Sequence, residues 1–154
     1  MKAIFWGGLA CAVFDITQAM LAWGLIYGAP PMRILQGVAS GLLGRAAREG
    51  GWSSAALGAL CHCVIAFGAA AVYYLASRRI TLMTARPVLA GLIYGELVFW
   101  FMQIVVRLSR ATPRPWSDPA QIVTGPIGHM FLVGLPIALI VSRFAPLPVP
   151  SAAR

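Results

Sequence analysis

The chain has 154 residues, of which 60% are hydrophobic and 10% are charged, whereas soluble domains carry about 25% charged residues. This composition excludes an ordinary soluble fold and indicates an integral membrane protein. The net charge of +8 could suggest nucleic-acid binding, but the twelve basic residues are spread over the loops and both ends rather than gathered in one stripe. We therefore expect the positive charge to meet anionic lipid headgroups and not nucleic acid.

Four apolar stretches are each long enough to cross a lipid bilayer as a helix. They cover residues 3–27, 53–77, 87–106 and 121–142, and each holds about the 20 mainly apolar residues that a spanning helix needs. The connections leave little of the chain for a separate aqueous domain. The sequence thus predicts an all-α fold, a four-transmembrane-helix bundle forming a single integral membrane domain over residues 1–154.

The connection between the first two spans predicts an amphipathic helix over about residues 32–48. Pro30 and Pro31 end the first span and can start a new helix. Apolar residues recur every three or four positions on one face, namely Ile34, Leu35, Val38 and Leu42, and the opposite face carries Arg33, Gln36, Ser40, Gly44 and Arg48. We expect this helix to lie in the membrane interface. A gate or a re-entrant element is the alternative.

The short loop over residues 78–86 decides the expected orientation. It contains Arg78, Arg79 and Arg86, and short loops carry most weight in the positive-inside rule. Counted over the whole chain, the two sides of the bundle hold six basic residues each. We therefore expect both termini in the cytoplasm.

Prolines shape the second half of the chain. Pro113, Pro115 and Pro119 predict an irregular, exposed connection over residues 108–120, and residues 146–150 predict an extended tail. Inside the fourth span, Pro136 predicts a kink.

Each span carries one ionisable residue close to its middle; these are Asp15, His62, Glu96 and His129. Each shares its helical face with small or polar residues, which burial inside a bundle requires. Because successive helices run in opposite directions, all four fall within roughly 5 Å of one another along the membrane normal. The sequence predicts one buried polar layer, supported by Gln18 and Gln103.

Three interpretations of this layer stay open. It can be a hydrogen-bonded latch between helices, or it can handle protons, ions or a polar substrate, because two acids and two histidines can share protons near neutral pH. It can also hold haem or a divalent metal at His62 and His129, although the paired Glu-x-x-His pattern of di-iron bundles is missing. We expect no cofactor. No nucleophile motif, phosphate loop or dinucleotide fingerprint occurs, so we expect no enzymatic activity.

Two functional hypotheses follow. The first is a small non-enzymatic transport or proton-responsive module that acts through the polar layer. The second is a structural accessory subunit that docks on a larger membrane protein complex. Assembly of several copies of this chain into a homo-oligomer is a further expected partnership. Gly91 and Gly95 form a GxxxG pair, which permits close helix packing and suits either hypothesis.

Three segments carry a resemblance to known proteins. They are PPMRILQ at residues 30–36, VASGLLG at residues 38–44 and YYLASRR at residues 73–79. With these segments the chain resembles an uncharacterised family of small bacterial inner-membrane proteins, broadly YagU-like. The resemblance implies four helices in the bacterial inner (cytoplasmic) membrane and supplies no reaction.

Overall fold

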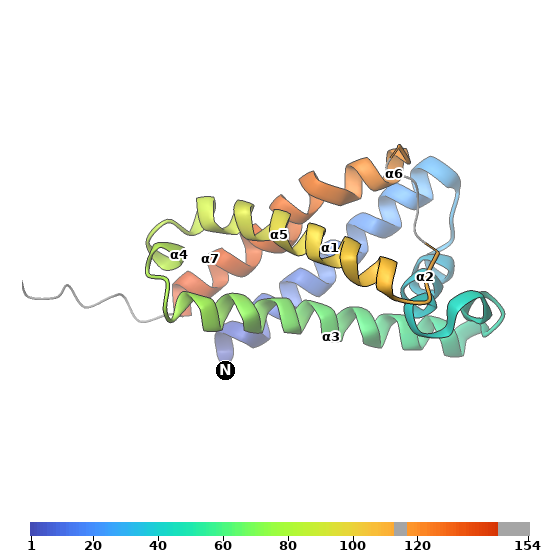
Figure 1. Ribbon diagram of the computed structural model, residues 1–154, viewed down its shortest axis with the longest axis horizontal. Coiled ribbons are helices and arrows are strands. Elements are labelled where there is room, and N and C mark those ends of the chain that lie inside the picture. Colours follow the sequence, from blue (N-terminus) through green and yellow to red (C-terminus); the bar gives the residue numbers. More distant parts are fainter. Residues whose placement is uncertain (113–116, 145–154) are drawn as a thin grey trace, which may run out of the picture.

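The computed structural model describes residues 1–112 and 117–144, and its described residues are mostly helical with no strand among them. Pro113, Pro115 and the tail predicted at residues 146–150 lie outside the described residues. Four helices are long and apolar enough to span a membrane: α1 (Lys2–Tyr27), α3 (Gly51–Ser77), α5 (Pro87–Leu108) and a fourth span, Pro119–Phe144 (Figure 1). The predicted all-α architecture with four spans is confirmed, and each span begins and ends within two residues of its predicted bounds.

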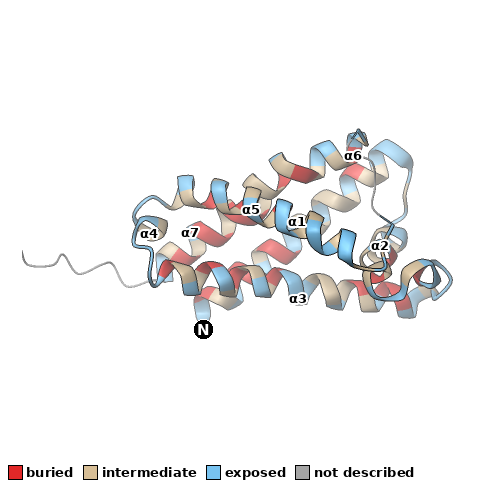
Figure 2. Cartoon of the chain, in the orientation of Figure 1, coloured by how far each residue is buried: buried red, intermediate tan, exposed pale blue. Residues whose placement is uncertain are grey.

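The outer surface of the bundle is apolar. Large side chains such as Leu25, Leu60 and Phe101 are 84%, 62% and 62% exposed, and the buried positions are interspersed with exposed ones along each long helix (Figure 2). An apolar surface of this extent marks contact with lipid or with protein. Together with the four spans, it describes a multi-pass membrane protein.

The helices pack as two tight pairs joined through α1. In the first pair, Gly8 of α1 lies against Phe67 of α3, where an added Cβ would come within 2.7 Å of the phenyl ring. In the second pair, α5 lies against the fourth span. Gly7 joins the pairs, because its Cβ position is 3.6 Å from Ala70 and 3.9 Å from Ile137. Small residues on α1 therefore let three helices approach one another.

Glycines bring α5 and the fourth span into backbone contact. A Cβ at Gly95 would overlap the carbonyl oxygen of His129, and a Cβ at Gly134 would overlap the backbone of Gly91 and Gly95. Gly91 and Gly95 are buried, as is Phe99 one turn further along α5. The GxxxG pair of the sequence thus lies at the closest contact between these two helices.

The fourth span is interrupted near its beginning. Its parts are α6 (Pro119–Ile122), the π-helical turns η2 (Val123–Ile127) and η3 (His129–Gly134), and α7 (Leu135–Phe144). Gly125 has a non-helical backbone with φ −75° and ψ −120°, because a following proline disfavours the helical region and supplies no N–H. The non-helical backbone of this span thus lies at Gly125, before Pro126. Pro136, where the sequence predicts a kink, lies at the start of α7, which follows directly on the π-helical turn η3.

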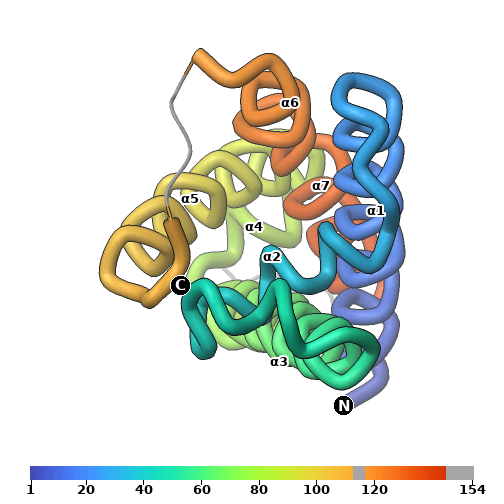
Figure 3. Tube along the Cα trace, turned by 90° about the vertical axis from the view of Figure 1, so that its right-hand side faces the viewer, coloured from blue at the N-terminus to red at the C-terminus, as the bar shows by residue number. Residues whose placement is uncertain are grey.

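The first connection contains α2 (Pro31–Leu43), followed by the 3₁₀ turn η1 (Gly44–Arg48). Gly44 has a φ of 60°, a left-handed conformation that glycine adopts without strain. α2 packs closely on α3, because a Cβ at Gly58 would overlap the carbonyl oxygen of Leu35. We call this side of the bundle the α2 end, and the side with Lys2, α4 (Leu82–Ala85) and Phe144 the terminal end (Figures 1 and 3).

The buried face of α2 differs from the predicted one. Gln36, placed by the sequence pattern on the outward polar face, is 1% exposed, whereas Leu42 of the predicted apolar face is 57% exposed. The Gln36 amide is satisfied in its buried place, because Nε2 donates to the carbonyl oxygen of Gly51 at 3.0 Å and to Ser54 Oγ at 3.3 Å. The spacing of apolar residues could not predict the burial of Gln36, because an amide that is buried and hydrogen-bonded is still a polar residue in the sequence.

Candidate functional site

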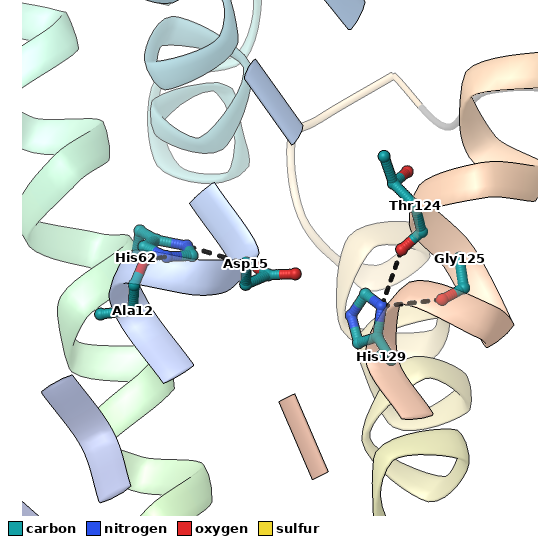
Figure 4. A network of polar contacts seen from close by, with 6 residues as sticks. All are labelled: Ala12, Asp15, His62, Thr124, Gly125 and His129. Atoms are coloured by element: carbon teal, nitrogen blue, oxygen red, sulfur yellow. Dashed lines mark hydrogen bonds and ion pairs between the residues drawn. The ribbon is translucent and has the colours of Figure 1, made fainter. Parts of the chain in front are cut away.

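The packing of α1 on α3 brings two of the four mid-span ionisable residues together. His62 Nδ1 lies 3.9 Å from Asp15 Oδ2, and the two side chains are 13% and 24% exposed (Figure 4). This separation suits an ion pair and is too long for a hydrogen bond. Asp15 and His62 are thus a partly buried acid–histidine pair between two helices.

The other ring nitrogen of His62 fixes which atom can exchange a proton. His62 Nε2 lies 3.0 Å from the carbonyl oxygen of Ala12, and a carbonyl oxygen only accepts hydrogen bonds, so Nε2 carries the hydrogen and donates. Nδ1 then carries no hydrogen in the neutral ring and carries a proton in the imidazolium cation. This atom faces Asp15.

His129 belongs to a different environment. Its Nδ1 lies 2.9 Å from the carbonyl oxygen of Thr124 and 3.0 Å from that of Gly125, so it donates to the backbone at the kink. Its ring packs edge-on against Phe99, with centroids 5.4 Å apart. His129 therefore stabilises the interrupted start of its own span, where the irregular backbone leaves carbonyl groups in need of donors.

Gln18 connects α1 to the fourth span. Its Nε2 donates to the carbonyl oxygen of Val123 at 3.0 Å, and its amide fills the space beside Gly128, where a Cβ would overlap it. Gln18 Oε1 is buried, and within residues 1–112 and 117–144 it has no hydrogen-bond partner. Asp15 and Gln18 lie one turn apart on α1, so the same helix turn touches both α3 and the fourth span.

Glu96 lies beside the buried stripe of α5 rather than on it. Its Oε1 accepts a hydrogen bond from Trp100 Nε1 at 2.8 Å, and Trp100 is 48% exposed. Its Oε2 is buried and has no hydrogen-bond partner in the described part of the chain. Glu96 thus pairs along its own helix and not with a histidine.

Gln103 lies apart from these residues. It is seven residues beyond Glu96 on α5, which is about 10 Å along a helix, and it lines a cavity at the α2 end. The predicted layer is therefore divided. Asp15 and His62 form one cluster, and His129 with the carbonyl groups of Thr124 and Gly125 forms another, with no hydrogen bond or ion pair between the two clusters among the described residues (Figure 4).

The metal-ligating capacity of the described residues is limited. They contain no group of three or more His, Cys, Asp or Glu side chains able to hold a metal ion. Asp15 and His62 together would offer two ligands. The two histidines each direct one ring nitrogen to a backbone carbonyl, and they lie in separate clusters (Figure 4).

Several participants were not predicted from sequence. The carbonyl groups of Ala12, Thr124 and Gly125 define the histidine tautomers, and Trp100 binds Glu96. Backbone acceptors leave no mark on residue type, so side-chain patterns cannot reveal them. The Gly125–Pro126 pair was the available signal for the kink.

Comparison with known proteins adds no relative. No family model, no curated protein and no solved structure matches the chain.

Proposed function

We propose that this protein is a small, non-enzymatic, proton-responsive transport module of the bacterial inner membrane, and that Asp15 and His62 are the residues that exchange the proton. The observation that carries the proposal is the 3.9 Å approach of His62 Nδ1 to Asp15 Oδ2 in the middle of two spans. Ionisable residues inside membrane spans are costly, and they mark proton and substrate pathways by preference.

The geometry supports a change of helix contact with proton binding. When Nδ1 carries a proton, the imidazolium and the carboxylate attract each other across the α1–α3 contact. Without that proton, the Nδ1 lone pair faces a carboxylate oxygen, and attraction is lost. Because Gln18 on the next turn of α1 holds the fourth span through Val123, a movement of α1 reaches that span as well.

The test is a proton-flux measurement in proteoliposomes under an imposed pH gradient, with a pH-sensitive dye inside. We expect Asp15→Asn and His62→Gln to lower the flux by about tenfold or more, as loss of a proton-transfer group does. Glu49→Gln is the control, because Glu49 is exposed and lies between α2 and α3, outside the spans. Circular dichroism and gel filtration check that each variant is folded.

Two outcomes would oppose the proposal. One is a wild-type flux equal to that of empty liposomes. The other is an unchanged flux in both Asp15→Asn and His62→Gln. If such a protein also retained a larger membrane complex through mild purification, a structural accessory role would replace the transport role.

A further inference from the structure

A large cavity opens at the α2 end of the bundle. Its volume is about 980 Å³, and its walls come from α1, α2, η1, α3, α5 and α6. The end-on view shows α2 lying between α1 and α5, with α3 below (Figure 3). Ligand cavities in proteins have volumes of about 300–1,000 Å³, so this space has the size of a small-molecule site.

Two sets of hydrogen bonds hold α2 over this cavity. On one side, buried Gln36 donates to the backbone of Gly51 and to Ser54. On the other side, the backbone N–H of Arg110, just after α5, donates to the carbonyl oxygen of Gly41 at 3.0 Å. The helix that lines the cavity is therefore tied both to α3 and to the end of α5.

The rim contributed by α2 and η1 is strongly basic. Arg33, Arg45 and Arg48 line the cavity together with one acid, Glu49. Arg33 is held in place, because its NH1 group donates to Gln36 Oε1 at 3.3 Å and to the carbonyl oxygen of Arg48 at 3.0 Å. Within the described ranges, the side chains of Arg45 and Arg48 make no hydrogen bond and no ion pair. The rim thus carries three guanidinium groups against one carboxylate, and in the described part of the chain no ion pair neutralises Arg45 or Arg48.

The inner wall is mainly apolar, with Gln103 as a polar member. Trp23 of α1, Ile65 of α3, and Met102 and Val105 of α5 line it. These residues lie within the apolar spans, toward their ends on this side of the bundle. One cavity therefore combines a cationic rim at the membrane interface with an apolar interior within the membrane.

We infer that this cavity binds one anionic amphiphile, a lipid with a phosphate headgroup. The phosphate lies against Arg45, Arg48 and Arg33, whose guanidinium groups match phosphate oxygens in pairs, and the hydrocarbon chain lies along Trp23 and Met102. Basic pockets between membrane helices bind phosphate headgroups for the same reason. The lining does not include Asp15 or His62, so lipid binding can be tested separately from the proposed proton response.

Native mass spectrometry of the full chain, after exchange into defined lipid–detergent mixtures, tests this inference. The probes are phosphatidylglycerol, a prenyl phosphate and zwitterionic phosphatidylcholine. We expect one tightly bound molecule of a phosphate-headed anionic probe and no such binding of phosphatidylcholine. Binding of phosphatidylglycerol identifies a bilayer lipid as the source, whereas binding of the prenyl phosphate alone identifies a carrier lipid; both support the anionic amphiphile.

Matched variants separate this site from general lipid contact. The double variant Arg45→Gln with Arg48→Gln should weaken binding by about tenfold, as expected for loss of charge-assisted contacts. Arg78→Gln with Arg79→Gln removes the same charge at the terminal end, away from the cavity, and should leave binding unchanged. Equal weakening by the two double variants, or equal binding of phosphatidylcholine, would overturn the inference.

A second pair of variants tests where the hydrocarbon chain of the lipid lies. Met102→Trp adds bulk to the inner wall and should lower lipid occupancy while all arginines remain. Ile104→Trp adds the same indole two residues away, at a position that is 58% exposed and outside the cavity lining, and should leave occupancy unchanged. Unchanged occupancy in Met102→Trp would show that no lipid chain fills the cavity.

Discussion

The two ends of the bundle differ in how closely their spans pack. Toward the terminal end, glycines bring α5 and the fourth span into backbone contact, and Tyr94 of α5 bonds to α3 through the carbonyl oxygen of Ala69 at 2.7 Å. Toward the α2 end, the space between the spans is a cavity covered by a short helix. In the closed half, glycines bring two spans together. In the open half, the close glycine contact joins α2 to α3 at Gly58, while the space between the spans is lined by arginines and covered by a helix that the buried Gln36 amide holds.

The polar residues at mid-span lie between these two halves. Gly95 of the closed half touches the backbone of His129, and Gln103 of the open half lines the cavity. A bundle that is tight at one end and hollow at the other can change at the hollow end without losing its fold. The proposed proton response and the lipid site accordingly lie beside the glycine contact between α5 and the fourth span and not within it.

The largest effect is expected from Gly95→Ala. A methyl group there would overlap the carbonyl oxygen of His129, so α5 and the fourth span must separate. Overpacking of this kind costs about 3 kcal/mol, and we expect a large drop in the thermal unfolding temperature measured in detergent. The helices of the closed half should then no longer be packed more closely than those of the open half.

The control for this variant is Gly68→Ala in α3. A Cβ at Gly68 meets nothing within 4 Å, and alanine favours a helix over glycine by about 1 kcal/mol. The same added methyl should therefore leave the unfolding temperature unchanged or raise it. Similar losses in the two variants would show that backbone contact is not what holds the closed half.

A smaller and more local effect is expected from Gln36→Ala at the open end. The change removes the donor to Gly51 and Ser54 and the acceptor of Arg33, at a cost of about 2 kcal/mol for a buried hydrogen-bonded group. α2 should loosen, and hydrogen exchange of its amides should become faster while α5 is unaffected. Ser40→Ala is the control, because among the described residues Ser40 Oγ bonds to the carbonyl oxygen of Gly37 of its own helix and to no other helix. Slow exchange in both variants would contradict the role given to Gln36.

The sequence predicted the spans well and the polar layer only in part. Span bounds follow from hydrophobicity and length, which local composition records directly. The GxxxG pair was also visible, because the absence of a side chain is itself a sequence feature. Helical faces and depths correctly indicated that Asp15 and His62 could come close, but they gave the same indication for Glu96 and His129.

The parts of the site that the sequence did not predict depend on how each helix is rotated about its axis and on backbone carbonyl groups that accept hydrogen bonds. Glu96 lies one residue away from the buried stripe of Gly91, Gly95 and Phe99, and a rotation of one residue decides whether it meets a histidine or Trp100. His129 meets carbonyl groups freed at Gly125, which depend on a kink. The cavity arises from how the helices diverge, which side-chain periodicity does not encode.

The smallest effect is expected from Tyr94→Phe, which tests what closes α3 against α5. The variant loses the hydroxyl group that donates to Ala69 and keeps the ring, which packs edge-on against Tyr73 with centroids 5.0 Å apart. Hydrogen bonds between membrane helices contribute about 0.6 kcal/mol, so the unfolding temperature should fall by a small, measurable amount. Tyr74→Phe should cause no fall, because the Tyr74 hydroxyl group makes no hydrogen bond to the described residues. If Tyr94→Phe also causes none, ring packing alone closes this contact, and the difference between the two ends is one of packing and not of polar bonds.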